Sequence, residues 1–244
     1  MPPAVADNRR MTARHDALAD LLLAIANAAA AADRPRAARL LAVSKTRTPS
    51  EVAALADAGQ VAFGENYVQE ALPKIAALRG RGLEWHLIGH LQSNKAKDAA
   101  LTFDWVQSVD RPALVAALAR HRPADAPPLD VLLQVNIDDE ASKHGCTPME
   151  VDALADAVAA ESRLRLRGLM AIPAPHEDPA RRRAAFRAMA RLFAGLQDRH
   201  PGIDTLSMGM SEDFAEAIAE GATMVRIGSA LFGPRPSKHE ESTA

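Results

Sequence analysis

The sequence predicts an α/β fold, a single (β/α)8 barrel of the TIM type, on three observations. Short apolar runs alternate with longer stretches in which alanine and leucine recur at helical spacing. The runs are almost wholly apolar, as in parallel strands that are covered on both faces. The unit recurs eight times within 244 residues, which is the size of a closed barrel. No Gly-x-Gly-x-x-Gly motif follows the first run, which disfavours an open dinucleotide-binding sheet.

The apolar runs themselves are the predicted strands. They span residues 40–44, 61–64, 84–89, 105–109, 131–137, 165–172, 203–208 and 224–228. The helices predicted between them span residues 50–58, 66–78, 91–101, 112–120, 148–160, 179–199 and 211–219. Ser50 before Glu51, and Pro148 at a first helical position, are typical helix start signals.

We expect one domain, with its core at about residues 40–233. An amphipathic helix is expected before it, at about residues 11–32, and a mobile tail after it, at residues 234–244. The apolar stretch 21–32 is too short to span a membrane. The proline-rich segment 123–128 is interpreted as a loop within the domain, because the strand–helix alternation continues after it.

The composition excludes several classes of partner. The net charge is −2 with both signs mixed, which gives no electrostatic reason to bind nucleic acid or an acidic membrane. Cys146 is the single cysteine and cannot form an intrachain disulfide, which fits a reducing compartment. We therefore expect a cytoplasmic protein, and a monomer.

Lys45 is the most informative single residue. Alone among the six lysines, it ends a strand-like apolar run. Partial burial at that place disfavours the ammonium form and lowers the pKa of the amine, which leaves a nucleophile that can form an imine with an aldehyde. A structural alternative is a lysine whose stem packs on apolar surface while its head reaches water.

The ends of the last two predicted strands suggest an anion site. The segment from Ser207 through Gly209 to Ser211 precedes a predicted helix, and Gly228-Ser229 follows Arg226. Glycines allow close approach of backbone N–H groups to an anion, and a barrel often binds phosphate after strands seven and eight. Taken singly, the first segment is more typical of a helix cap at Ser211, and the second of a tight turn at Gly228.

Closure of a barrel joins the two features, because the eighth strand pairs with the first. Lys45 and Gly228-Ser229 then lie on the same rim, where an imine-forming amine next to an anion cradle suits pyridoxal 5′-phosphate. Arg226 is placed to face the ring nitrogen of that cofactor. A permanent cation there cannot accept the pyridinium proton, so the ring would remain a weak electron sink.

Several ordered motifs carry a family resemblance. They are Ala42-Val-Ser-Lys-Thr46, Phe63-Gly-Glu-Asn-Tyr67, Trp85-His-Leu-Ile-Gly89, Leu91-Gln-Ser-Asn-Lys95, Gly168-Leu-Met-Ala-Ile-Pro173, Ser207-Met-Gly-Met-Ser211 and Val225-Arg-Ile-Gly-Ser229. Through them the chain resembles the pyridoxal phosphate homeostasis protein (YggS/PROSC) family from about residue 40 to 233. The resemblance implies a barrel like the N-terminal domain of alanine racemase.

The resemblance also implies roles for individual residues. Lys45 falls on the family lysine that carries the cofactor as an internal aldimine. By the same transfer, Arg226 should face the ring nitrogen, Asn66 should lie near the cofactor, and Lys143 matches a position of secondary importance. The phosphate should be held by four residues, which are Ser207, Gly209, Gly228 and Ser229. The chain departs from many relatives at His90 and Met208, which affects only local loop shape.

Two kinds of function remain open, a carrier and an enzyme. Racemases and decarboxylases with this barrel have a second domain that supplies an opposing acid–base residue, whereas only 11 residues follow Gly233 here. We therefore predict a non-catalytic protein that carries or buffers pyridoxal 5′-phosphate for vitamin B6 and amino-acid homeostasis, with apo-enzymes that use the cofactor as acceptors. The alternatives are a free-standing amino-acid racemase that acts through Lys45, and a cofactor-free Schiff-base aldolase.

A metal centre is not predicted. His86 and His90 are four residues apart, but they straddle the end of a predicted strand and do not share a helix face. No cysteine or carboxylate cluster in the sequence completes a set of four ligands around them.

Overall fold

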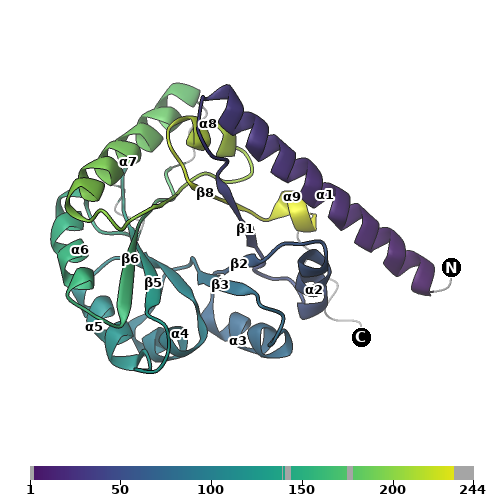
Figure 1. The fold of residues 1–244 in the computed structure, drawn as a ribbon, viewed down its shortest axis with the longest axis horizontal. Coiled ribbons are helices and arrows are strands. Elements are labelled where there is room, and N and C mark those ends of the chain that lie inside the picture. Colours follow the sequence, from purple (N-terminus) through teal and green to yellow (C-terminus); the bar gives the residue numbers. More distant parts are fainter. Residues whose placement is uncertain (1–2, 139, 141–143, 175–177, 234–244) are drawn as a thin grey trace.

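The computed structural model describes residues 3–138, 140, 144–174 and 178–233. Eight parallel strands close into a barrel in chain order, from β1 to β8, so the predicted fold class is confirmed (Figure 1). The strands are β1 (Arg39–Val43), β2 (Ala62–Glu65), β3 (Glu84–Leu87), β4 (Trp105–Val109), β5 (Leu129–Gln134), β6 (Leu164–Met170), β7 (Thr205–Ser207) and β8 (Met224–Ile227).

Helices surround the barrel in the described part of the chain. They are α1 (Pro3–Ala31), α2 (Pro49–Asp57), α3 (Val68–Ala77), α4 (Ala96–Thr102), α5 (Pro112–His121), α6 (Val151–Ala159), α7 (Pro179–Arg199), α8 (Phe214–Ala219) and α9 (Ser229–Phe232). Single 3₁₀ turns at Ser93–Lys95 and Pro148–Glu150 lead into α4 and α6. None of the helices described is long and apolar enough to cross a bilayer.

Helix α1 begins earlier than the predicted residue 11 and runs along one side of the barrel (Figure 1). It packs against α2, α8 and α9, and it buries Leu18, Leu21, Ile25 and Ala29. This spacing of three to four residues puts one apolar stripe of the helix on the domain. Helix α1 therefore covers the side of the barrel where the last strand meets the first.

Several predicted element ends are wrong by a few residues. Helix α2 is capped by Thr48, not Ser50, because Pro49 takes the first helical position and Glu51 completes a capping box with the Thr48 side chain and main chain. The helix predicted at 211–219 begins only at Phe214, with Asp213 as its N-cap, so Ser211 is left in the preceding loop. The four-residue helix α9 was not predicted.

The register between β1 and β8 determines which side chains meet at the seam. Leu41 lies opposite Arg226, and Ala42 lies opposite Ile227. Both strands end shortly afterwards, so the loop that follows β1 and the turn into α9 leave the barrel side by side. Since carboxyl ends of barrel strands carry functional groups, this seam is the first place to look for a site.

Candidate functional site

A cavity of about 170 Å³ opens at the carboxyl end of the seam between β1 and β8. Lys45, Arg226, Gly228 and Ser229 line it, together with Met210 and Ser211 from the loop before α8. Four of the residues predicted from the sequence therefore lie around one cavity. No carboxylate, histidine or tyrosine of the described residues is among those that line it, so its charged groups are all basic.

Lys45 sits on a loop whose start is firmly anchored. The main-chain N–H of Ser44 donates to the carbonyl of Gly64 at 2.9 Å, which extends the β1–β2 pairing by one residue. Thr46, directly after the lysine, has a φ of 63°. A β-branched residue in that left-handed region is strained, and such strain persists only where surrounding contacts hold it. Lys45, which lies between Ser44 and Thr46 in the chain, is half-buried.

A buried ion pair holds the start of this loop in place. Lys74 of α3 donates from Nζ to the carbonyl of Ser44 at 2.8 Å and to Oε1 of Glu65 at 2.6 Å. The Ser44 hydroxyl also donates to Oε1 of Glu65. Burial raises the pKa of the Glu65 carboxyl, against the opposing effect of the Lys74 ammonium. The sequence pattern places Lys74 in an ordinary polar helix, but it is only 4% exposed and is the anchor of the Lys45 loop.

Arg226 of β8 is a buried cation beside the cavity, with 4% of its surface exposed. Its Nη1 donates to the Ser207 hydroxyl and its Nη2 to the carbonyl of Ala171, both at 2.8 Å. Burial lowers the pKa of the guanidinium to about 10, which still leaves it charged at neutral pH. Because neither of these partners is an anion, much of the positive charge remains available to a ligand.

Ser207 at the end of β7 faces Arg226 and not the cavity. Its hydroxyl accepts from Arg226 and donates to Oε1 of Gln107 at 2.7 Å. The residue is fully buried and is not among those that line the cavity. Its predicted part in phosphate binding stays a prediction, and the structure gives its side chain a partner that the sequence did not suggest.

Small residues and hydroxyl groups also line the cavity. Ser229 begins α9, and its hydroxyl lies 3.4 Å from that of Ser211. A Cβ atom at Gly228 would come within 3.0 Å of the Val43 carbonyl oxygen, so only glycine lets the turn lie this close to β1. Gly209 has a φ of +92°, and a Cβ there would meet the Ala217 side chain at 2.5 Å.

Asn66 lies elsewhere on the same face of the barrel. With Tyr67, Gln92 and His144 it lines a second cavity, of about 580 Å³. It is not among the residues around Lys45, so its predicted nearness to the cofactor stays a prediction. Lys143 lies outside the described residues.

A cluster of possible metal ligands borders this second cavity. One ligand atom from each of His90, Asp110 and His144 lies within 4.8 Å of the others. However, the His90 and His144 rings are stacked, with centroids 3.7 Å apart and planes 13° from parallel. A histidine nitrogen binds metal in the plane of its ring, so stacked rings do not direct both lone pairs at one ion.

The matches with known proteins define first a class and then a family. Residues 18–236 match the family model of the alanine racemase N-terminal domain, so the chain belongs to this class of barrel proteins. A pyridoxal phosphate homeostasis protein of Escherichia coli K12 is 55% identical over 204 residues, which are 82% of this chain and 87% of that one. The corresponding protein of Pseudomonas aeruginosa PAO1 is 53% identical over 219 residues, 89% of this chain and 94% of that one. The chain belongs to the pyridoxal phosphate homeostasis protein family, which confirms the resemblance predicted from its motifs.

Solved structures agree with this assignment. PipY of Synechococcus elongatus PCC7942 without PLP is 36% identical and superposes with a TM-score of 0.81, over 90% of this chain and 99% of that one. The same protein with PLP bound gives a TM-score of 0.77, over 90% and 100% of the two chains. Alanine racemase from Corynebacterium glutamicum, at 21% identity and a TM-score of 0.68, shares the fold over 92% of this chain and 63% of its own.

Proposed function

We propose that this protein binds pyridoxal 5′-phosphate reversibly through Lys45 and thereby carries or buffers the cofactor. The observation that carries the proposal is the meeting of Lys45, Arg226 and Ser229 around one cavity where β1 and β8 close the barrel. The aldehyde of this cofactor condenses reversibly with a primary amine, with release of water. The relatives named for pyridoxal phosphate homeostasis, and PipY with PLP bound, support the choice of ligand.

The side chains around the cavity suit an aldehyde that bears an anion. Lys45 supplies the amine, and the absence of acids among the described lining residues leaves the positive charge of Arg226 uncompensated. Gly228 and Ser229 supply a close-lying backbone and a hydroxyl at the start of α9, while Gly209 shapes the facing turn. We assign the phosphate to this wall and the ring nitrogen to Arg226, with Ser207 taking part through Arg226.

We favour a carrier over an amino-acid racemase because the described residues that line the cavity offer no second acid–base group beside Lys45. A two-base racemase needs a proton donor or acceptor on each face of its substrate. Lys45 can serve one face, but Tyr67, the single tyrosine of the chain, lines the neighbouring cavity. A guanidinium at the ring nitrogen also keeps the ring neutral, which weakens it as an electron sink.

The setting of the proposed carrier follows from the same features. We propose a cytoplasmic monomer that hands its cofactor to apo-enzymes and so contributes to vitamin B6 and amino-acid homeostasis. The buried Cys146, whose thiol pKa burial raises to about 12, is not poised for disulfide chemistry. An open cavity at the barrel rim is compatible with release of the cofactor to an acceptor.

The decisive experiment is to map the attachment site. Purified protein loaded with pyridoxal 5′-phosphate is treated with borohydride, which makes the covalent linkage permanent, and its peptides are examined by mass spectrometry. We expect modification at Lys45, and loss of it together with the visible absorbance in Lys45→Ala. Lys97→Ala, which removes an exposed lysine of α4, is the control and should load normally.

Three results would contradict the proposal. Modification that persists unchanged in Lys45→Ala would show that another amine holds the cofactor. Racemisation of a panel of amino acids by the loaded protein, lost in Lys45→Ala, would favour the racemase over the carrier. A purified protein that fails to bind the cofactor but cleaves aldol substrates would favour an aldolase instead.

A further inference from the structure

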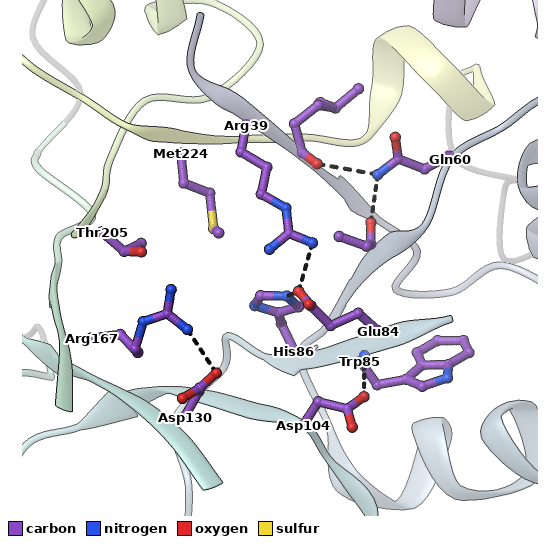
Figure 2. A network of polar contacts seen from close by, with 12 residues as sticks. Arg39, Gln60, Glu84, Trp85, His86, Asp104, Asp130, Arg167, Thr205 and Met224 are labelled. Carbon is purple, nitrogen blue, oxygen red and sulfur yellow. Dashed lines mark hydrogen bonds and ion pairs between the residues drawn. The ribbon is translucent and has the colours of Figure 1, made fainter. Parts of the chain in front are cut away.

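A chain of hydrogen bonds crosses the barrel interior from the amino end to Arg226. It starts at Glu84, the first residue of β3. The Glu84 carboxylate is hydrogen-bonded to Nε2 of His86 (Figure 2). Gln107 of β4 lies on the other side of the imidazole, with its Nε2 2.9 Å from Nδ1 of His86. The Oε1 of Gln107 accepts from Ser207, which in turn accepts from Arg226. The residues of this continuous hydrogen-bond chain thus come from four strands, β3, β4, β7 and β8.

The two ends of the chain fix the direction of every bond in it. A guanidinium can only donate and an ionised carboxylate can only accept, so each hydrogen must point from Arg226 toward Glu84. Ser207 accepts from Arg226 and gives its own hydrogen to Gln107. The amide nitrogen of Gln107 therefore donates to Nδ1 of His86, and Nε2 of His86 carries the proton that Glu84 accepts. Reversal of the amide would leave the unprotonated Nε2 facing a carboxylate.

The middle of this hydrogen-bond chain is buried, and its imidazole is neutral. His86, Gln107 and Ser207 are all fully buried. Burial lowers the pKa of His86, although the carboxylates of Glu84 and Asp104 oppose this effect and Arg39 adds to it. The His86 ring is also stacked on that of Trp105, with centroids 4.9 Å apart. A neutral, stacked imidazole holds one tautomer, which suits a fixed donor–acceptor order.

We propose that Gln107 is a positioning residue for the cofactor site, which acts through Ser207 to hold the Arg226 guanidinium in place against the cofactor ring. This inference rests on the proposed function, and it extends it to residues on the far side of the barrel core. Ser207 has one hydroxyl hydrogen, which it gives to Gln107, so its side chain serves Arg226 and does not donate to the phosphate.

The main test compares two glutamines. Gln107→Leu breaks the chain at its centre, whereas Gln60→Leu makes the same change at another buried glutamine, which bonds only to the carbonyls of Leu40 and Ala62 in the contacts described. Apo-protein of each variant is titrated with pyridoxal 5′-phosphate and with its 1-deaza analogue, in which CH replaces the ring nitrogen. We expect Gln107→Leu to weaken binding of the natural cofactor about tenfold relative to Gln60→Leu, because a bond to a charged group is misaligned.

The 1-deaza analogue separates action on the ring nitrogen from action on the fold. With no nitrogen for Arg226 to face, Gln107→Leu and Gln60→Leu should bind the analogue within about twofold of each other. Ser207→Ala, a smaller change with less risk to folding, should repeat the behaviour of Gln107→Leu. Equal losses for both ligands, or binding by Gln107→Leu and Ser207→Ala that matches Gln60→Leu, would overturn the inference.

Nitrogen NMR of the apo-protein tests the chain without any cofactor. The inferred direction requires His86 to carry its proton on Nε2 and to leave Nδ1 unprotonated, in wild type and in Gln60→Leu. A proton on Nδ1 would overturn the inferred order of bonds. The NMR measurement needs no ligand, so it tests the hydrogen-bond chain even if wild-type protein does not bind the cofactor at Lys45. Failure to bind at Lys45 would count against the proposed function alone.

Discussion

The arginines at the amino end of the barrel differ from Arg226 at the carboxyl end in the kind of partner they have. At the amino end, arginines are matched by carboxylates: Arg39 pairs with Glu84 at 2.8 Å, and Arg167 pairs with Asp130 at 2.9 Å (Figure 2). Arg167 also pairs with Asp204 at 2.6 Å. At the carboxyl end, Arg226 has only a hydroxyl and a carbonyl as its closest described partners. The difference teaches that the amino-end arginines are compensated within the fold, while Arg226 keeps positive charge available for an anionic ligand.

Two buried or half-buried glutamates at the two ends differ in the direction of their pKa shifts. Glu65 ends β2 at the carboxyl end, and burial raises its carboxyl pKa in spite of Lys74. Glu84 begins β3 at the amino end, where the bonds from His86 and Arg39 together outweigh burial and lower its pKa to about 2. Each predicts a different response of stability to pH, so the comparison can be tested from both sides.

The largest effect on stability is expected from Lys74→Met. Removal of the ammonium leaves the Glu65 carboxylate buried without its cation, which costs about 3–5 kcal/mol in comparable ion pairs. The free energy of unfolding, measured with urea at pH 7.5, should fall by that order. A carboxyl whose pKa is raised by folding favours the folded state at low pH, so the loss should shrink as the pH is lowered toward 5.

The double variant Glu65→Gln/Lys74→Met provides the control. It removes both charges, so it should be more stable than Lys74→Met alone at pH 7.5 and should lose the pH dependence. If Lys74→Met costs less than about 1 kcal/mol, the pair is solvated and does not anchor the Lys45 loop in the way we describe.

A smaller effect, with the opposite pH dependence, is expected from Glu84→Gln. The folded pKa of Glu84 lies near 2 against a reference value of 4.5, so its contribution is present above pH 4.5 and is lost as the pH falls toward 2. Because 28% of its side chain is exposed, we expect about 1–2 kcal/mol at pH 7, less than the full shift implies.

Acid titration of unfolding measures this contribution directly. The difference between wild type and Glu84→Gln should close between pH 4.5 and 2. Glu212→Gln, at an exposed residue before α8, serves as the control and should run parallel to wild type. A difference that stays constant over this interval would mean that the charge of Glu84 does not stabilise the amino end.

These pairs also mark the limit of what the sequence could predict. The apolar runs predicted all eight strands, and closure of the barrel then brought Lys45 to Ser229, because that proximity follows from topology alone. The partnership of Glu65 with Lys74 could not be predicted, since helical spacing says nothing of which side chain turns inward. The same holds for Gln107, which with Ser108 interrupts an otherwise apolar strand and whose partners come from β3, β7 and β8.

The smallest effect concerns the other cluster at the carboxyl end, His90 with Asp110 and His144. Burial and the neighbouring His144 lower the pKa of His90, against the pull of Asp110, so metal would not have to displace a proton at pH 7.5. Geometry is the obstacle: the stacked rings would have to separate before both nitrogens could reach one ion. We therefore expect an equimolar addition of Zn²⁺ to change the midpoint of thermal unfolding by less than about 1 °C. The His90→Ala variant should respond to the same addition in the same way. A stabilisation that requires both histidines would show that they do turn toward a common ion, and the carboxyl end would then hold two ligand sites in place of one.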